Sequence, residues 1–393
     1  MRTVGVEEEL LLVRSGSGQA ISIAPQVLRR ADLAAREHDA DDDRPGPGHP
    51  AEAGSSLGGE LQRQQVETDT APHRTMEALG EELVAWRSHA EGAARREGAR
   101  IAAIATSPLP VEPRAGESDR YRQIVERFGL TGSEQLTCGC HVHVSVDSDE
   151  EAVAVLDRIR VWLPVLLAVS ANSPYWQGRD SGYASYRNQV MGRWPTAGPP
   201  DLFGSAEAYH RFVEDSVASG VAMDPGMVYL DARLSSSYPT LEFRVADVCQ
   251  DVRDTVLLAA LSRALVQATS ARWRAGEPVP QVRTQMLRLA TWQAARYGLS
   301  GELLDPVTSR PRPAADVLAD LVEYVRPALE EYDDVALVTE GVARLLTDGT
   351  GADRQRREME RTGSLSDVVA AAVRTTHGLE GQDHDLTVAQ LRA

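Results

Sequence analysis

The stretch Val4-Gly5-Val6-Glu7-Glu8-Glu9-Leu10 decides the fold together with Cys138-Gly139-Cys140-His141-Val142-His143-Val144 and Thr240-Leu241-Glu242-Phe243-Arg244-Val245. Each of these stretches is predicted to be a β-strand, and side chains alternate between the two faces of a strand. Alternation places acidic, histidine and arginine side chains together on one face of each strand, in three pairs: Glu7 with Glu9, His141 with His143, and Glu242 with Arg244.

The opposite face of the second and third stretches is apolar, with Val142, Val144, Leu241 and Phe243. An antiparallel sheet often buries one face on a core and leaves the other free. The pattern therefore predicts a sheet with a polar site on one face, which is typical of an enzyme. The pair Cys138 and Cys140 points away from the histidines, which argues against a zinc site built from both residue types.

Strands are predicted mainly in the first part of the chain, at residues 3–13, 60–70, 101–107, 135–146, 227–234 and 240–246. Helices are predicted at 25–37, 74–100, 150–170 with a kink at Pro164, 205–220, 252–275, 281–297, 314–332, 335–347 and 365–376. No regular crossover helices join the strands, which favours an α+β fold with a helical C-terminal part. We expect one domain over residues 1–393, with a flexible insertion at 38–59 and a loose tail at 377–393.

The composition excludes several functions. A net charge of −17 argues against nucleic acid and anionic membranes as partners. The absence of a signal peptide, of a long apolar run and of an even cysteine count predicts a cytoplasmic protein. All 41 basic residues are arginine, so lysine Schiff bases and a P-loop lysine are excluded, and any phosphate must be held by arginine, metal ions or backbone amides.

The strand faces predict a site for a hard cation. Glu67 is the natural third carboxylate after Glu7 and Glu9, and Asp69 shares its face. Glu242 supplies a further carboxylate, and carboxylate oxygens suit Mg²⁺ or Mn²⁺. Carboxylates that share a pocket repel one another unless cations are bound.

Each of these motifs also has a structural interpretation. The run Glu7-Glu8-Glu9 alone is typical of a solvated edge strand, and His141-x-His143 alone is more often a structural pair. The run Asp41-Asp42-Asp43 is interpreted as solvated surface. Structural or surface roles are expected for the remaining histidines: His38, His49, His73, His89, His210, His377 and His384. The functional interpretation depends on four separate segments that offer the same chemistry.

Those four segments, in this order, resemble the glutamate–cysteine ligase type 2 family of carboxylate–amine ligases. Further strings resemble the family's sequence, among them Ser170-Ala171-Asn172-Ser173-Pro174, Gly182-Tyr183-Ala184-Ser185-Tyr186-Arg187, Arg193-Trp194-Pro195-Thr196-Ala197-Gly198-Pro199-Pro200, Val245-Ala246-Asp247-Val248 and Gly351-Ala352-Asp353-Arg354-Gln355-Arg356. The resemblance extends over roughly residues 3–376.

The resemblance implies the catalytic fold of glutamine synthetase, in which a curved antiparallel sheet holds ATP and Mg²⁺ on its concave face and helices pack on the convex face. It implies that ATP phosphorylates a carboxylate and that an amine attacks the acyl phosphate. L-Glutamate and L-cysteine are the expected substrates, and another amine or carboxylate is the alternative. The adenine-binding residues stay unassigned.

The resemblance also assigns residues. The metal ligands are expected to be Glu7, Glu9, Glu67, His141 and Glu242. Arg244 matches the arginine of the family's Glu-x-Arg strand. Arg244, together with Arg187, is expected to stabilise the transferred phosphoryl group, and residue type alone suggests that Tyr183, Tyr186 and Trp194 wall the acceptor pocket.

Two other functional classes stay open at this stage. A metal-dependent hydrolase of the His-x-His barrel type would need more histidines at strand ends and typically a modified lysine, and the chain offers neither. A non-catalytic metabolite or nucleotide binder on the same scaffold would be free to lose several of the acidic residues, which are all present. The expected partners are small molecules, with room for a homodimer.

Overall fold

A seven-stranded sheet forms the centre of the computed structural model, which describes residues 1–41 and 56–378. The strands are β1 (Val4–Arg14), β2 (Ser56–Gly59), β3 (Gln65–Asp69), β4 (Ala99–Ala102), β5 (Gly139–Ser145), β8 (Ala232–Leu234) and β9 (Thr240–Asp247). Their order is β2-β3-β1-β5-β9-β8, and β4 also pairs with β1. Every pairing is antiparallel, so the predicted α+β fold with an antiparallel sheet is confirmed.

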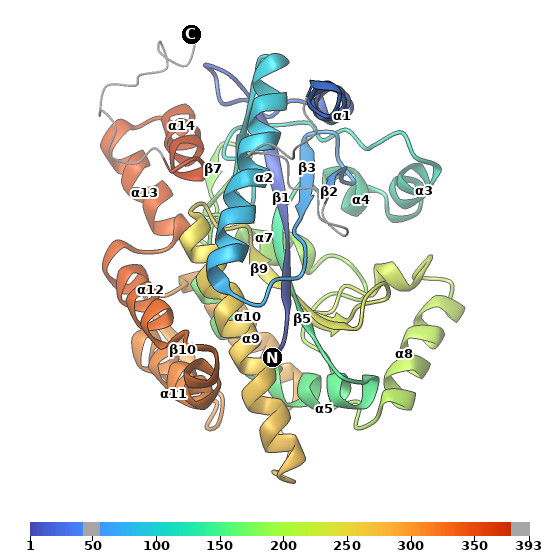
Figure 1. The fold of residues 1–393 in the computed structure, drawn as a ribbon, viewed down its shortest axis with the longest axis vertical. Helices are drawn as coiled ribbons and strands as arrows, with labels where there is room; N and C mark the ends of the chain where they lie inside the picture. The colour runs from blue at the N-terminus through green and yellow to red at the C-terminus, as the bar shows by residue number, and fades with distance from the viewer. Residues whose placement is uncertain (42–55, 379–393) are drawn as a thin grey trace.

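Two long helices, α2 (Met76–Arg96) and α9 (Val252–Arg274), lie across one face of the sheet (Figure 1). Thr75 and Asp251 begin them, because each side chain accepts a hydrogen bond from a backbone amide of the first turn. The apolar side chains of β5 and β9 point to this side, where they share a core with α9, α5 (Asp149–Ile159) and α6 (Leu163–Ser170). The polar face of the sheet is thereby left on the other side.

The C-terminal part is helical, as predicted. It comprises α10 (Thr284–Tyr297), α11 (Ala314–Tyr332), α12 (Val335–Asp348), α13 (Gly351–Thr362) and α14 (Leu365–Thr376). Figure 1 shows α11 to α14 side by side along one flank of α2 and α9. The shorter elements of the chain are α1 (Ala24–Asp41), α3 (Asp119–Phe128), α4 (Leu130–Glu134), α7 (Tyr186–Met191), α8 (Ala206–Ala218), a 3₁₀ turn at Pro225–Met227, and the strand pairs β6 (Tyr175–Trp176) with β7 (Arg179–Asp180) and β10 (Glu302–Leu304) with β11 (Pro311–Pro313).

The predicted insertion at 38–59 is wrong at both of its ends. Helix α1 continues to Asp41, and Ser56–Gly59 is the edge strand β2, which pairs with β3. Residues 42–55 lie outside the described residues. The predicted tail is also wrong at its start, because His377 caps α14 and its Nε2 lies 3.2 Å from a Glu91 carboxylate oxygen. Residues 379–393 lie outside the described part.

The predicted kink at Pro164 is wrong as well. The chain leaves α5 at Ile159 and begins a separate helix, α6, at Leu163. Pro164 lies in the first turn of α6, where its missing N–H has no hydrogen bond to lose. Within residues 1–41 and 56–378, each helix is either too short or too polar to cross a bilayer.

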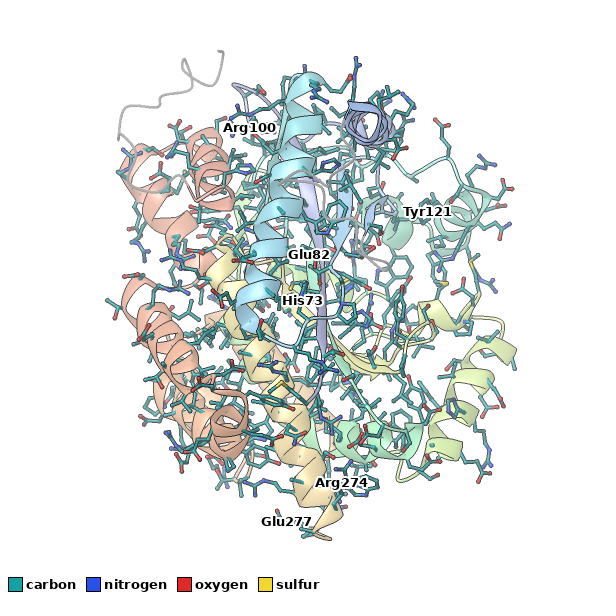
Figure 2. The ribbon with its side chains drawn as sticks, in the orientation of Figure 1. His73, Glu82, Arg100, Tyr121, Arg274 and Glu277 are labelled. Atoms are coloured by element: carbon teal, nitrogen blue, oxygen red, sulfur yellow. The ribbon has the colours of Figure 1, made fainter. Side chains whose placement is uncertain are left out.

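A buried ion pair fixes β1 to the helices beneath it. The Arg87 guanidinium donates to both carboxylate oxygens of Glu8 at 2.7 and 2.8 Å, and both side chains are almost fully buried. Near the start of the same helix, His73 and Glu82 lie beside one another and form an ion pair (Figure 2). These contacts hold β1 and the segment before α2 in place, consistent with the structural role predicted for His73.

Candidate active site

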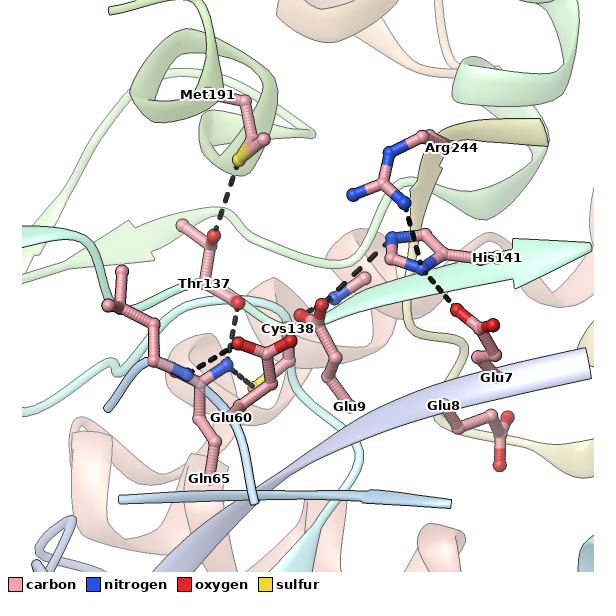
Figure 3. Close-up of polar contacts among 12 residues, drawn as sticks. Glu7, Glu8, Glu9, Glu60, Gln65, Thr137, Cys138, His141, Met191 and Arg244 are labelled. Carbon is pink, nitrogen blue, oxygen red and sulfur yellow. Dashed lines mark hydrogen bonds and ion pairs between the residues drawn. The ribbon is translucent and has the colours of Figure 1, made fainter. Parts of the chain in front are cut away.

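A pocket opens on the face of the sheet opposite α2 and α9, and Figure 3 shows Glu7 and Glu9 projecting toward it while Glu8 points the other way. Strand register builds this pocket. Glu7 pairs with His141 across β1 and β5, and Glu9 pairs with Glu67 across β1 and β3. Because paired residues in a sheet point to the same side, segments distant in sequence deliver their polar groups to one place.

The Glu7 carboxylate is held by two histidines. His141 Nδ1 lies 2.9 Å from one oxygen, and His143 Nε2 lies 2.9 Å from the other. Burial opposes ionisation of Glu7, but the hydrogen bonds from His141 and His143 outweigh it and hold its pKa below the ordinary value. Burial also opposes ionisation of His143, yet its bond to Glu7 raises its pKa. His143, which also contacts the Thr240 hydroxyl, therefore positions Glu7.

The surroundings of Glu9 and Glu67, the carboxylates next to Glu7, disfavour their ionised forms. Burial, and then repulsion from Glu60, raises the pKa of Glu9. The pKa of Glu67 is raised well above its ordinary value, first by burial and then by repulsion from Glu60 and Glu7. Carboxylate oxygens gathered in this way are the donor set that a divalent cation prefers.

Three groups of ligand atoms lie close enough to hold a cation, since the atoms within each group lie within 4.8 Å of one another. The groups are Glu7 with His141 and Glu242, Glu7 with Glu67 and Asp69, and Glu9 with Glu60 and Glu67. His141 Nε2 is buried, has no hydrogen-bond partner among the described residues and lies 3.9 Å from a Glu9 oxygen, so this nitrogen is available as a ligand on the Glu9 side of the acidic group. Burial, and then the charge of Arg244, lowers the pKa of His141, so its ring is neutral and free to donate a lone pair. The donor set therefore fits hard divalent cations.

Glu242 is engaged by two arginines. Arg233 Nε lies 2.7 Å from one of its oxygens, and Arg244 forms an ion pair with the other. Burial opposes ionisation, but the charges of Arg244 and then Arg233 bring the pKa of Glu242 down to about 2. Arg244 Nη1 also lies 3.5 Å from His141 Nδ1 (Figure 3). Arg244 thus lies at the border between the acidic group and the rest of the pocket.

Arg187 reaches the pocket from α7, a short helix that begins where the Ser185 hydroxyl accepts a hydrogen bond from Asn188 N–H. Its guanidinium donates to the backbone carbonyls of Val245 and Arg244, at 3.4 and 3.3 Å. Its Nε is buried and has no partner among the described residues. The guanidinium lies directly over Gly139 on β5, where only a residue without a Cβ leaves room for it.

Gly139→Ala is expected to destabilise the protein, because its Cβ would collide with the buried Arg187 guanidinium. Overpacking of this kind costs about 1–3 kcal/mol. Urea denaturation checks the prediction. Gly92→Ala on α2 is the matched control, since a Cβ there meets nothing within 4 Å. Its free energy of unfolding is expected to rise by up to about 1 kcal/mol, because alanine has a higher helix propensity than glycine. Equal stability of Gly139→Ala and the wild type would contradict the close packing.

All seven predicted site residues line this one pocket: Glu7, Glu9, Glu67, His141, Arg187, Glu242 and Arg244. Trp194 lines it too, whereas Tyr183 and Tyr186 are not among its lining residues. Their role, and that of Trp194, as a wall of the acceptor pocket stays a prediction. The two tyrosines belong to a separate aromatic group. The Trp292 indole N–H donates a hydrogen bond to the Tyr183 hydroxyl, and Tyr186 packs beside Trp176. The sequence prediction also missed Glu60 and Arg233, and assigned no role to His143.

The site predicts a pH dependence of metal-induced stabilisation. The raised pKa values of Glu9 and Glu67 mean that the folded, metal-free protein holds protons there more tightly than the unfolded chain. The stability from this source is present below the unfolded carboxyl pKa, about 4.3, and is lost as pH rises through the folded values. Mg²⁺ needs these groups deprotonated, so it should raise the melting temperature more at about pH 8 than at about pH 5. An equal shift at both pH values would contradict binding at these carboxylates.

Comparison with known proteins identifies relatives over almost the whole chain. The family model described as glutamate–cysteine ligase family 2 matches residues 3–371. A Streptomyces coelicolor protein, provisionally named glutamate–cysteine ligase 2, is 52% identical over 376 residues, which are 96% of this chain and 99% of that protein. A Frankia alni protein, provisionally named glutamate–cysteine ligase 2-2, is 49% identical over 377 residues, or 96% and 97% of the two chains.

Solved structures share the fold at low sequence identity. Glutamate–cysteine ligase from Francisella tularensis, solved in complex with AMP, superposes with a TM-score of 0.64 at 13% identity, over 99% of this chain and 91% of that one. A bifunctional glutathione synthetase from Pasteurella multocida gives a TM-score of 0.66 at 16% identity, over 96% of this chain and 52% of that one. The family match and the identities near 50% decide the relationship: this chain belongs to glutamate–cysteine ligase family 2.

Proposed function

We propose that the protein is an ATP-dependent carboxylate–amine ligase that joins the γ-carboxylate of L-glutamate to the amine of L-cysteine. Membership of glutamate–cysteine ligase family 2 and the names of its relatives support this reaction. The AMP bound to the Francisella tularensis enzyme supports an adenine nucleotide as the co-substrate. The observation that carries the proposal is the convergence of five acidic side chains, two histidines and three arginines on one pocket: Glu7, Glu9, Glu60, Glu67, Glu242, His141, His143, Arg187, Arg233 and Arg244.

The reaction proceeds in two steps. An oxygen of the substrate carboxylate attacks the γ-phosphorus of ATP, the bond from that phosphorus to the bridging oxygen breaks, and ADP leaves with the electron pair. The amine nitrogen then attacks the carbonyl carbon of the acyl phosphate, the carbon–oxygen bond to phosphate breaks, and phosphate leaves. Phosphoryl transfer of this kind depends on alignment of the reacting atoms and on compensation of negative charge more than on covalent help from the protein.

The acidic groups would hold Mg²⁺ or Mn²⁺. Glu7, His141 and Glu242 would form one site, and Glu67 would contribute to the others with Asp69, Glu9 and Glu60. Bound there, the cations would supply positive charge to the nucleotide phosphates. His143 keeps the Glu7 carboxylate in position through its 2.9 Å contact. The absence of lysine from the chain supports this arrangement, because metal ions and arginines then remain the main sources of localised positive charge.

Arg244 and Arg187 would bind the transferred phosphoryl group. Arg244 is partly buried beside Glu242, whose charge raises the pKa of Arg244 against the effect of burial, so Arg244 stays charged. Arg187 keeps its buried Nε unpaired among the described residues. Guanidinium groups make paired hydrogen bonds to phosphate oxygens, and buried ones do so with little competition from water. We assign both arginines to stabilisation of the phosphoryl group and the acyl phosphate.

Oxygen transfer tests the proposal. L-Glutamate labelled with ¹⁸O in its γ-carboxylate should yield phosphate that carries one labelled oxygen, because the attacking oxygen leaves with phosphate when the amide forms. An ATP hydrolase would place an oxygen from water on phosphate instead. Unlabelled phosphate in a reaction that consumes ATP would therefore contradict the acyl-phosphate route, whereas labelled phosphate with an amine other than L-cysteine would keep the mechanism and change the second substrate.

A further inference from the structure

A second cavity, with a volume of about 300 Å³, adjoins the acidic pocket. The two share four lining residues, namely Arg187, Met191, Tyr229 and Arg244. The two arginines assigned to the phosphoryl group therefore stand between the cavities. The second cavity extends from them toward Asp231 and toward α10, which contributes Arg288, Thr291 and Trp292. We call it the Asp231 cavity.

Asp231 is buried in this cavity with an unused carboxylate oxygen. Its side chain is only 7% exposed, and Oδ2 has no hydrogen-bond partner among the described residues. Its backbone is fixed on both sides, since its N–H donates to the Gly198 carbonyl and its carbonyl accepts from Arg244 N–H, each at 2.9 Å. A buried carboxylate that lacks a partner is costly and requires a reason. The backbone bond to Arg244 also fixes its position relative to the phosphoryl-binding arginine.

Two further groups in the Asp231 cavity have unused hydrogen-bonding capacity. Arg288 on α10 is exposed to solvent, makes no side-chain hydrogen bond or ion pair with the described residues, and exerts its charge on Asp231. The Thr291 hydroxyl, one turn further along α10, is buried without a partner among the same residues. One carboxylate, one guanidinium and one hydroxyl complement a zwitterion, because an ammonium pairs with the first and a carboxylate with the second. An α-amino acid has this chemistry.

We infer that the Asp231 cavity binds the incoming amine substrate as an α-amino acid, with its ammonium on Asp231 and its carboxylate on Arg288. This inference rests on the proposed function, since it names the place of the second substrate of that reaction. It adds a binding subsite and a proton acceptor to the residues that activate the first carboxylate. Bound in this way, the amino acid lies beside Arg187 and Arg244, which line both cavities, so its amine is next to the phosphoryl group that these arginines would hold.

The chemistry of the nitrogen decides which of the two amino acids belongs here. The amine substrate must lose two protons during amide formation, whereas the α-ammonium of glutamate loses none. Asp231 takes the first proton from the ammonium, which frees the lone pair that attacks the acyl carbon. The second proton leaves with phosphate as the carbon–oxygen bond breaks. Burial raises the pKa of Asp231 to about 7 against the opposing charges of Arg187 and Arg288, which suits a proton acceptor at neutral pH.

Asp231→Asn tests the inference, because it keeps the shape of the side chain and removes the proton acceptor. We expect kcat/KM for L-cysteine to fall by about 100-fold or more. Glutamate-dependent scrambling of ¹⁸O from the β–γ bridge of ATP, measured without any amine, reports the first step and should stay within about twofold of wild type. Hydroxylamine is neutral at pH 7 and has no carboxylate, so its reaction with the acyl phosphate should also be largely retained.

Arg288→Gln provides the second variant. It should raise KM for L-cysteine while leaving the hydroxylamine reaction and the isotope scrambling unchanged. Asp215→Asn on the exposed side of α8 removes the same charge at a distance and should change none of these rates. Loss of isotope scrambling in Asp231→Asn, or a rise in KM for glutamate in place of cysteine, would overturn the inference. Absence of scrambling in the wild type would instead contradict the proposed function itself.

Discussion

Glu67→Gln is expected to lower the ligase rate by more than about 100-fold while raising the melting temperature of the metal-free protein. Glu67 belongs to two of the three groups of ligand atoms, so its loss weakens both. In the absence of metal its carboxylate is buried and repelled by Glu60 and Glu7, which raises its pKa well above the ordinary value. A neutral amide of the same shape removes that repulsion. Activity and stability should therefore change in opposite directions.

Steady-state phosphate release and thermal unfolding measure the two effects. Glu117→Gln is the matched control, because Glu117 is 80% exposed and its ion-pair partner among the described residues is Arg63 at the surface. The control should leave both quantities near those of the wild type, since exposed pairs contribute about 1 kcal/mol or less. Retained ATP consumption in Glu67→Gln would contradict the assignment of Glu67 to the metals. A lower melting temperature of metal-free Glu67→Gln than of the wild type would contradict the proposed repulsion between Glu67 and its acidic neighbours.

Arg87→Met is expected to reduce the free energy of unfolding by about 3–5 kcal/mol, because it leaves Glu8 charged and unpaired in the core. Glu8 has no exposed surface, and apart from Arg87 its carboxylate is bonded to the Thr255 hydroxyl at 2.8 Å. Arg87 also donates to the carbonyls of Cys249 and Gln250, each at 2.7 Å. A third carbonyl, that of Thr376, accepts from Arg87 at 3.4 Å. The loss of Arg87 therefore leaves one charge and three carbonyls without this donor, directly beneath Glu7 and Glu9.

Urea denaturation of matched variants checks this prediction. Arg95→Met on the same helix removes an arginine whose side chain is 58% exposed, and it should cost less than about 1 kcal/mol. The double variant Glu8→Leu/Arg87→Met should be more stable than Arg87→Met alone, because it removes the unpaired charge together with its partner. A loss of less than about 1 kcal/mol in Arg87→Met would show that Glu8 finds another partner or becomes neutral without cost.

Side-chain alternation explains why the sequence predicted the central part of the site. Glu7 shares a strand with Glu9, His141 with His143, and Glu242 with Arg244, so the shared face within each pair follows from spacing alone. Register does not follow from spacing, so the pairing of Glu7 with His141 and of Glu9 with Glu67 could not be predicted from the strand sequences. The family resemblance supplied that arrangement indirectly.

The missed residues have identifiable physical causes. Glu60 differs from Glu67 by an odd number of positions, so strict alternation would put them on opposite faces. A turn between β2 and β3 resets the alternation and returns Glu60 to the acidic pocket. Arg233 was within a predicted strand, but its role appears only once β8 pairs it with Glu242. His143 shares its strand face with His141, so the same spacing pointed to it, but the sequence analysis gave it no role.

Helix α13 and the ends of the predicted insertion show that local sequence patterns do not predict every element. The helix Gly351–Thr362 is rich in arginine and acidic residues, and it buries only Gly351, Ala352 and Gln355, so its sequence has no apolar stripe to indicate it. Strand β2 is short and contains two glycines, and pairing with β3 is what makes it a strand. Both elements depend on tertiary contacts that local sequence does not encode.

The most direct test of the central claim is phosphate release from ATP by the purified protein with Mg²⁺ and L-glutamate, with and without L-cysteine. We predict that sustained phosphate release requires both amino acids and yields one γ-glutamylcysteine for each phosphate. The reason is that the acyl phosphate stays bound until an amine attacks it. No release with any carboxylate, despite bound nucleotide, would contradict the account and make the acidic pocket a binding site without ligase activity.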